Sequence, residues 1–512
     1  MARIAFISPR FDVSYWGLQH ALPYFGKRAN LPVACLPLLA ALTPDEHEVV
    51  LFDENVEELD FDLLATFDIV GVTGMIVQRF RMREILTELK HRDAFAVVGG
   101  PWITVNETYF GDLPDVIFVG EAEETWPQFL LEWKDGRHGR RYEQQHPTDM
   151  TKVPTPRNDL IASEKYMFGS LQFSRGCPFQ CEFCDIIVIF GRRPRLKTSR
   201  QLITELESHV AEGMDTVFVV DDNLIGNKKA IKSVLRDVAD WQRRRGYPLT
   251  FFTEASLDLA DDAELMQLMV EANFVSVFIG IESPNEESLR ETKKFQNVRQ
   301  GGSILEKIHR VQMSGLDVWC GMIVGFDHDD ATIFDRQREF LRDSRIAHAM
   351  LGMLHAIPTT PLYNRLIDEG RLDPSDEPEF GTNVIPQAMT REELREGYVQ
   401  VTKELYEPDA YFKRVDDLYL NPKFRFGTAK TEYLRRRPIR RMVSWLHETL
   451  KFKYVAYRVT HDVPNEALRR EYKQRIRNFC RHQKDPSARF VYAVKCAIHF
   501  HHHRMAQEMA DT

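Results

Sequence analysis

Residues 171–184 read LQFSRGCPFQCEFC and contain the strongest chemical signal in the chain. The apolar start of this stretch predicts a strand over residues 171–174. Cys177, Cys181 and Cys184 follow directly, which places the three thiols on the loop at the carboxyl end of that strand. Three thiolates on one short loop can converge on a soft metal centre. The spacing therefore predicts a metal site with these three cysteines as its ligands.

Two kinds of metal centre fit three cysteines. A structural zinc site needs a fourth Cys or a His, and the chain has no second CxxC motif, so zinc would require a distant histidine. An iron–sulfur cluster can be held by three thiolates while one iron stays open for a substrate or cosubstrate. We expect the cluster and keep zinc as the alternative.

The cysteine stretch begins a series of alternating strands and helices. Helical patterns separate the strands, for example at residues 201–212 and 263–271. Six such steps are fewer than an eightfold barrel has, so we expect a partial barrel with its site at the carboxyl ends of the strands. The predicted strands cover residues 171–174, 216–220, 249–253, 276–279, 318–324 and 349–356.

A second alternating unit precedes the barrel and predicts a doubly wound parallel sheet. Its strands are predicted at residues 4–8, 48–52, 69–73, 96–98 and 116–119. Glycine follows three successive strands, and glycine allows the backbone to approach a large ligand closely. We favour a ligand-binding rim over ordinary turn glycines. The predicted rim consists of Gly74, Met75, Gly99, Gly100, Gly120, Glu121 and Glu123.

The chain of 512 residues divides into four predicted segments of an α/β protein. These are a sheet domain at 1–135, a linker at 136–165, a barrel at 166–375 and a helical extension at 376–512, where the strand pattern disappears. Hydrophobic residues make up 43% and charged residues 28%, as in globular proteins, and no apolar run is long enough to span a membrane. The N-terminus is typical of a first strand rather than a signal peptide, and seven cysteines do not form a disulfide framework. We expect a cytoplasmic protein.

The CxxxCxxC motif after a first barrel strand resembles the radical S-adenosylmethionine (SAM) superfamily. The strand ends agree with this resemblance: VVDDN at 219–223, TEAS at 253–256 and GIES at 280–283. The resemblance implies a [4Fe–4S] cluster on Cys177, Cys181 and Cys184, whose fourth iron chelates SAM. One electron, supplied in this superfamily by a flavodoxin- or ferredoxin-type donor, would then cleave SAM. The SAM contacts implied in this way are Phe183, Asn223, Glu254, Gly280 and Glu282.

A strand–helix domain ahead of the barrel is similar to the layout of cobalamin-dependent radical SAM enzymes. The helical extension resembles one subgroup of them, which includes hopanoid and bacteriochlorophyll methylases. Many cobalamin domains carry DxHxxG after the first strand, but residues 10–18 contain no histidine. We therefore expect no histidine ligand to cobalt and place the loop at 75–78 beneath it.

The resemblance implies methylation of an unactivated carbon in a lipid or other natural product. Ring closure or rearrangement without methyl transfer is the first alternative, and a non-catalytic cobalamin-binding sensor is the second. The sequence assigns no catalytic residue beyond the cofactor ligands.

The end of the chain differs from the rest in charge. Residues 421–512 hold 21 Lys and Arg but only 8 Asp and Glu, although the whole chain carries a net charge of −9. A solvated basic face is one interpretation, and peripheral contact with an anionic inner-membrane surface is the other, because the arginines at 435–441 precede Trp445 and Leu446. Nucleic acid is not required. The histidines at 499 and 501–503 are expected at a solvated helix end.

Overall fold

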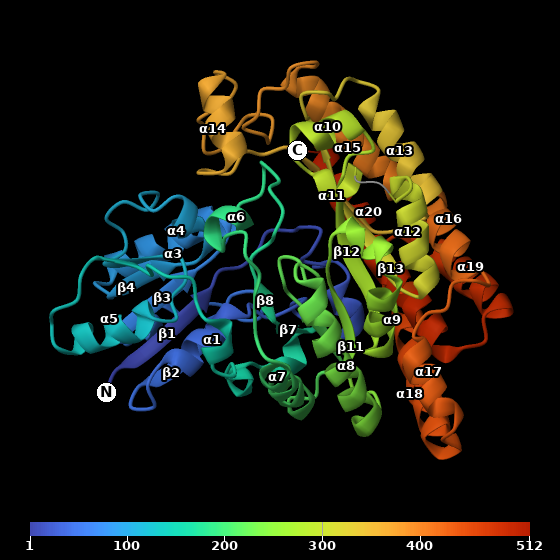
Figure 1. Cartoon of the computed structure of the whole chain (residues 1–512), viewed down its shortest axis with the longest axis horizontal. Helices are drawn as coiled ribbons and strands as arrows, with labels where there is room; N and C mark the ends of the chain where they lie inside the picture. Colours follow the sequence, from blue (N-terminus) through green and yellow to red (C-terminus); the bar gives the residue numbers. More distant parts are fainter. Residues whose placement is uncertain (299–300, 512) are drawn as a thin grey trace.

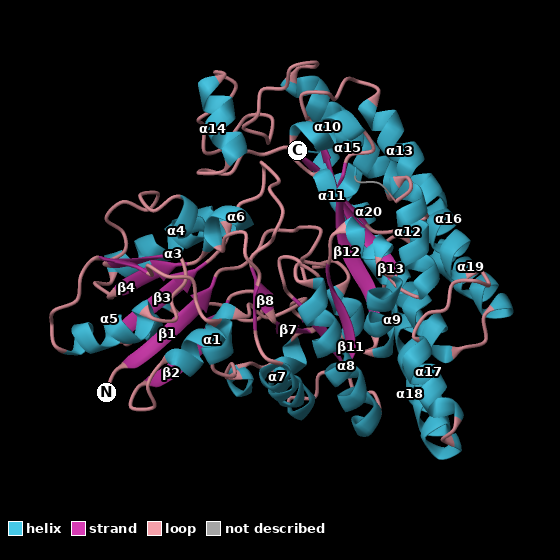
Figure 2. Ribbon diagram, viewed as in Figure 1, coloured by secondary structure: helices cyan, strands magenta, loops and turns pink. Residues whose placement is uncertain are grey.

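The computed structural model describes residues 1–298 and 301–511. Two parallel sheets lie side by side, and long helices of the C-terminal extension cover the outer side of the second sheet (Figure 1). Each sheet has helices around it, so the predicted α/β fold with a helical extension is confirmed (Figure 2). Within the described residues, no helix combines the length and the apolar character that crossing a bilayer requires.

The N-terminal sheet is parallel throughout, in the order β2-β1-β3-β4-β5-β6. Its central strands are nearly all buried because apolar cores lie on both faces. The strands are β1 Arg3–Ser8, β2 Glu48–Asp53, β3 Ile69–Thr73, β4 Ala96–Gly99, β5 Val116–Val119 and β6 Arg141–Glu143. The helices are α1 Cys35–Leu42, α2 Phe61–Leu64, α3 Arg79–His91, α4 Pro101–Val105 and α5 Thr125–Lys134. The segment at 136–165, expected as a linker, therefore contributes the edge strand β6.

The second sheet has the six parallel strands that the sequence predicts, in the order β14-β13-β12-β11-β10-β7. They are β7 Gly169–Leu171, β10 Thr216–Val219, β11 Thr250–Glu254, β12 Phe274–Glu282, β13 Asp317–Val324 and β14 Ala349–Met353. Helices cross between them: α7 Ser199–Ala211, α8 Lys228–Arg245, α9 Ala263–Glu271, α10 Glu286–Glu291, α11 Phe295–Val298, α12 Ile304–Ser314 and α13 Ile333–Ser344. Helix α14 Pro361–Asp368 follows the last strand. Strands in sequential order without pairing of β14 to β7 form a partial barrel.

A small hairpin carries the cysteine loop. Strand β8 Ser174–Arg175 pairs antiparallel with β9 Arg195–Leu196, and the loop between them includes helix α6 Ile186–Ile189. Gly176 follows β8 at φ +93°, and a Cβ there would lie 3.0 Å from the carbonyl oxygen of Gly191. Glycine is required at this position because other residues rarely adopt this backbone angle and because the backbone at Gly191 leaves no room for a Cβ.

The C-terminal extension shares one hydrophobic core with the barrel. Its helices are α15 Arg391–Leu405, α16 Pro408–Tyr419, α17 Thr428–Arg435, α18 Pro438–His461, α19 Glu466–His482 and α20 Pro486–Asp511. Helix α20 packs against α15, α18 and α19, so it lies inside the extension. Short 3-10 helices are η1 Leu22–Phe25, η2 Ile76–Gln78, η3 Met150–Lys152, η4 Asn158–Leu160, η5 Ser163–Lys165 and η6 Leu257–Asp261.

The expectation of a solvated histidine cluster at the end of the chain is wrong. Three of these histidines are fully buried and the fourth is 8% exposed, because α20 passes through the shared core. The His501 ring nitrogen Nε2 lies 2.9 Å from the carbonyl oxygen of Ser14, and the His502 ring stacks on Tyr15 at 4.6 Å. The four residues are His499, His501, His502 and His503. His501 and His502 hold the loop at 9–21, which follows β1, against the extension, whereas His499 and His503 lie against the carbonyl oxygen of Tyr406.

Candidate functional site

The cysteine loop lies between the carboxyl ends of the two sheets. Four side chains connect the hairpin to the rim of the N-terminal sheet: Arg175 binds Glu121 at 2.7 Å and Glu123 at 2.6 Å, and Arg195 binds Glu121 at 2.9 Å. All four side chains are at most 15% exposed. Burial opposes ionisation of Glu123, but the Arg175 guanidinium outweighs it and lowers the pKa of this carboxyl. The two strand-end rims are therefore joined at a buried ion-pair cluster.

The three thiols interact with one another and with two amides. Asn223 Nδ2 lies 3.9 Å from Cys177 Sγ, and Gln296 Nε2 lies 3.4 Å from Cys181 Sγ. Burial raises the pKa of the Cys177 and Cys184 thiols, and the neighbouring cysteines add to this shift. Among the residues that the structure describes, no three His, Cys, Asp or Glu side chains are arranged around a single metal ion. A four-iron cluster places a separate iron against each thiolate, so its ligands need not meet at one point.

A lysine supplies the positive charge next to the thiols. Lys294 Nζ lies 2.7 Å from Glu282 Oε1 and 5.8 Å from the centre of the Phe183 ring. Burial opposes its charge, but Glu282 and the thiolate forms of Cys181 and Cys184 outweigh burial and raise the pKa of Lys294. A buried ammonium group favours an anionic cluster at this position.

Three carboxyl groups lie at the ends of β10 and β11. Burial raises the pKa of Asp221 to about 6, of Asp222 to about 7 and of Glu254 to about 8, and the mutual repulsion of these groups adds to the last two shifts. Asp221 accepts hydrogen bonds from Phe173 N and Ser174 Oγ, and Asp222 accepts one from Gly176 N. The Glu254 carboxyl has no hydrogen-bond or ion-pair partner among the described residues. It is the group best placed to bind a cationic ligand.

The structure brings the predicted SAM residues to one end of the barrel. Glu282 has φ +66°, a strained angle for a residue other than glycine, and Gly280 lies beside it, where a Cβ would fall 2.9 Å from Lys294 Nζ. Asn297 Nδ2 donates to the carbonyl oxygens of Gly280 and Ile281 at 3.0 and 2.9 Å. Phe183 lies 6.2 Å from Phe326, between ring centres.

The glycines of the N-terminal rim differ in the space around them. Gly120 has φ +80°, and a Cβ there would meet nothing within 4 Å. Gly100 has φ +97° and lies tightly against Thr73 and Gly74. Met75 is 45% exposed, whereas Gln78 is buried and accepts a hydrogen bond from Met75 N at 3.1 Å. Gln78 therefore shapes this loop, and Met75 and Val77, the latter 59% exposed, are the side chains that reach outward.

Two predicted rim residues have a different environment from the one expected. The sequence predicts cofactor contacts for Glu121 and Glu123, but both carboxylates bind the arginines of the cysteine hairpin. Sequence reasoning also misses Lys294, Gln296 and Asn297, which come from the segment after β12. The segment TKKFQN at 292–297, polar except for Phe295, is the signal that marks them.

A partial parallel barrel with a three-cysteine loop at its carboxyl ends defines a radical SAM enzyme. Residues 171–335 match the model of the radical SAM superfamily, and residues 360–512 match a domain of unknown function, DUF4070. An uncharacterized methyltransferase of Synechocystis sp. is 40% identical over 80% of this chain and 77% of its own length. The hopanoid C-2 methylase of Rhodopseudomonas palustris is 34% identical over 81% of this chain and 79% of its own. This chain belongs to the radical SAM superfamily, in the group that includes these methyltransferases.

Solved structures share the fold. The radical SAM methyltransferase TsrM from Kitasatospora setae, with cobalamin and a [4Fe-4S] cluster bound, aligns with a TM-score of 0.62 and 16% identity over 85% of this chain and 99% of its own. The cobalamin-dependent enzyme OxsB, with aqua-cobalamin and SAM bound, aligns with a TM-score of 0.61 and 15% identity over 100% of this chain and 80% of its own.

Proposed function

We propose that this protein is a cobalamin-dependent radical SAM methyltransferase that methylates an unactivated carbon of a lipid or other natural product. The observation that carries the proposal is the ion-pair cluster of Arg175 and Arg195 with Glu121 and Glu123, because it joins the glycine rim of one sheet to the cysteine loop of the other. Methyl transfer between two cofactors requires their sites to share one chamber. The names of the related methyltransferases support the same reaction.

The residues fit the cofactors of this proposal. Cys177, Cys181 and Cys184 would hold three irons of the cluster, and Gly74, Met75, Gly99, Gly100 and Gly120 would form the cobalamin rim. Bound together, the cluster, SAM and cobalamin supply one-electron cleavage of SAM and a transferable methyl group. Asn223 and Gln296 direct N–H groups toward the thiols, an arrangement that raises a cluster's reduction potential. Glu254 would bind a cationic group of SAM, and a flavodoxin- or ferredoxin-type donor would supply the electron.

Product analysis with methyl-labelled SAM tests this function. Anaerobic, reconstituted protein is incubated with cobalamin, a reductant and candidate polycyclic lipids, and label in the lipid product is the expected result. An unlabelled product would favour cyclisation or rearrangement, and intact SAM would favour a sensor. The Cys181→Ala variant should abolish SAM cleavage and serves as the control for chemistry that does not depend on the cluster.

We also propose that helix α18 contacts an anionic membrane surface. Its outward residues are strongly exposed apolar side chains, including Met442 at 65%, Leu446 at 54% and Leu450 at 57%, next to the arginines at 435–441. Interfacial helices combine such a face with basic residues. Flotation with vesicles of phosphatidylglycerol at low salt should carry the protein upward, and a Leu446→Glu, Leu450→Glu variant should stay at the bottom. Absence of flotation by the unmodified chain would contradict this contact.

A further inference from the structure

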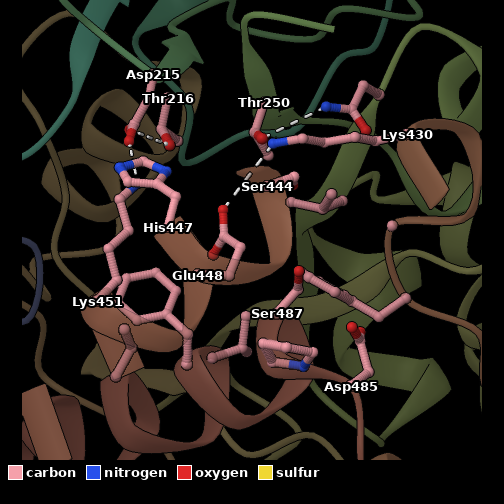
Figure 3. Close-up of a pocket in the computed structure, with 18 of the residues that line it drawn as sticks. Asp215, Thr216, Thr250, Lys430, Ser444, His447, Glu448, Lys451, Asp485 and Ser487 are labelled. Carbon is pink, nitrogen blue, oxygen red and sulfur yellow. Dashed lines mark hydrogen bonds and ion pairs between the residues drawn. The ribbon is translucent and has the colours of Figure 1, made fainter. Parts of the chain in front are cut away.

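A large cavity lies at the end of the barrel opposite the cysteine loop. Its volume is about 1260 Å³, which exceeds the roughly 300–1,000 Å³ of most small-molecule pockets. One wall consists of residues where barrel strands begin, such as Thr216 of β10, Thr250 of β11 and Asp317 of β13. Helices α17, α18 and α20 of the extension form the other walls. Figure 3 shows Ser444 of α18 and Ser487 of α20 at this cavity.

Trp16 lies inside the barrel and lines this cavity. The loop after β1 carries Trp16 into the barrel, where its ring centre lies 5.0 Å from that of Phe278, 6.0 Å from Phe218 and 6.5 Å from Trp319. Trp16 and Trp319 both line the cavity. Glu254 and Glu282 end the same strands on the other side. The cavity is therefore a site distinct from the cofactor rims.

The interior of the cavity suits an apolar body with a few polar contacts. Aromatic side chains line it, including Phe168, Phe252 and Phe490. Two lining residues that are more than nine-tenths buried carry polar atoms without a partner among the described residues: the Tyr15 hydroxyl and the Asn30 side-chain oxygen. Both atoms have almost no accessible surface, so they face the packed wall rather than the open cavity. The aromatic lining is therefore the feature that suits an apolar body.

The mouth of the cavity is basic and lies beside an exposed apolar surface. Lys451 and Lys430 pair with Asp215 and Glu448, whereas Arg440 and Arg441 have no carboxylate partner among the described residues. Lining residues of α18 are also exposed, with Ile439 at 75%, Val443 at 61% and Trp445 at 55%. Free cations next to an apolar entrance match a molecule with an anionic head and an apolar body.

We propose that this cavity, between the amino ends of the barrel strands and helices α18 and α20, binds an anionic amphiphile. Its apolar body lies against Trp16, Trp319 and Phe252, and its head group lies at Arg440 and Arg441. The ligand is held here without being converted, because the cysteine loop lies at the opposite ends of the strands. The site goes beyond the methyl transfer proposed above and does not depend on it.

Tryptophan quenching in the full-length chain tests the site without any turnover. Three of the seven tryptophans line the cavity, and bromine atoms quench indole fluorescence at contact distance. The probe is 9,10-dibromostearate below the concentration at which it aggregates, with stearate as the non-quenching reference. Saturable quenching by the brominated acid is the expected result. Absence of saturable quenching beyond the stearate reference would overturn the proposal.

Filling variants locate the bound probe. Ser444→Phe and Ser487→Phe narrow the cavity from two walls and should each weaken binding by about tenfold, equal to 1.4 kcal/mol. Leu446→Phe lies on the same helix outside the cavity and should leave binding unchanged. The Arg440→Gln, Arg441→Gln variant should weaken binding at low salt, and Arg477→Gln, Arg481→Gln on α19 should not. Equal quenching in both filling variants and the unmodified chain would place the probe on the outer face of α18 and refute the cavity.

Discussion

The environment of Glu254 leads to a specific prediction about the binding of a cationic ligand. Burial and the neighbouring Asp222 raise its pKa to about 8, so the carboxyl is protonated in the ligand-free protein at neutral pH. Burial also raises the pKa of Asp222 to about 7, and repulsion from Asp221 adds to this shift. A cationic ligand favours the ionised form, so binding must release a proton.

We therefore predict that SAM binds more tightly as the pH rises from about 6 to about 8. The sign follows from the raised pKa, because protons compete with the ligand below it and no longer compete above it. Anaerobic titration calorimetry in buffers of different ionisation heat measures both the affinity and the released proton. Glu254→Gln should weaken SAM binding by roughly tenfold and flatten the pH dependence. The exposed Glu287→Gln is the matched control, and a pH profile unchanged in Glu254→Gln would contradict the prediction.

The elements show where sequence patterns succeed and fail. The central strands are predictable because their apolar runs are buried on both faces, as in β3 and β13. Strand β6 is not, because only Tyr142 of its three residues is buried and an edge strand needs no apolar run. The histidines of helix α20 suggest a solvated surface because histidine is polar, but one nitrogen of each ring lies at a backbone carbonyl of a distant segment, as in the contact of His501 with Ser14.

One buried ion pair connects α20 to the barrel, and its loss should lower the free energy of unfolding. Lys495 Nζ lies 2.5 Å from Asp317 Oδ2 at the start of β13, and both side chains are 4% exposed. We predict that Lys495→Met destabilises the protein by about 3–5 kcal/mol, because it leaves the Asp317 carboxylate buried without a cation, with only the neutral Tyr419 hydroxyl and Trp319 indole N–H as side-chain donors. Denaturant titration followed by circular dichroism measures the loss.

The double variant Lys495→Met, Asp317→Asn distinguishes a missing partner from lost packing. It removes both charges and should recover most of the stability. Lys413→Met breaks the exposed pair with Asp417 on α16 and should change stability by at most about 1 kcal/mol. A double variant as unstable as the single one would show that the charge has no part in the effect.

At the scale of the whole molecule, the sequence identifies the two units but not how they meet. The cysteine spacing and the glycine-ended strands predict both rims. The contact between them depends on Arg175 and Arg195, two among many arginines, which reach Glu121 and Glu123 across more than 50 residues of chain. Gln296 reaches Cys181 across 115 residues in the same way. Such pairs leave no periodic signal, because only the folded arrangement brings them together.

The last prediction concerns the buried ion-pair cluster that joins the two sheets. Arg175 lies two residues before Cys177, and its guanidinium is the cation that binds Glu123. Arg175→Met leaves the Glu123 carboxylate buried without a cation, with only the Thr148 hydroxyl and a backbone N–H as donors, and such a loss costs about 3–5 kcal/mol. We predict faster proteolysis within residues 136–165 and lower retention of iron after anaerobic reconstitution. Adding Glu123→Gln should restore both, because it removes the unpaired charge. Arg193→Met changes an exposed arginine of the same loop and should behave as the unmodified protein. If Arg175→Met behaved like this control, the ion-pair cluster would not be what joins the two sheets.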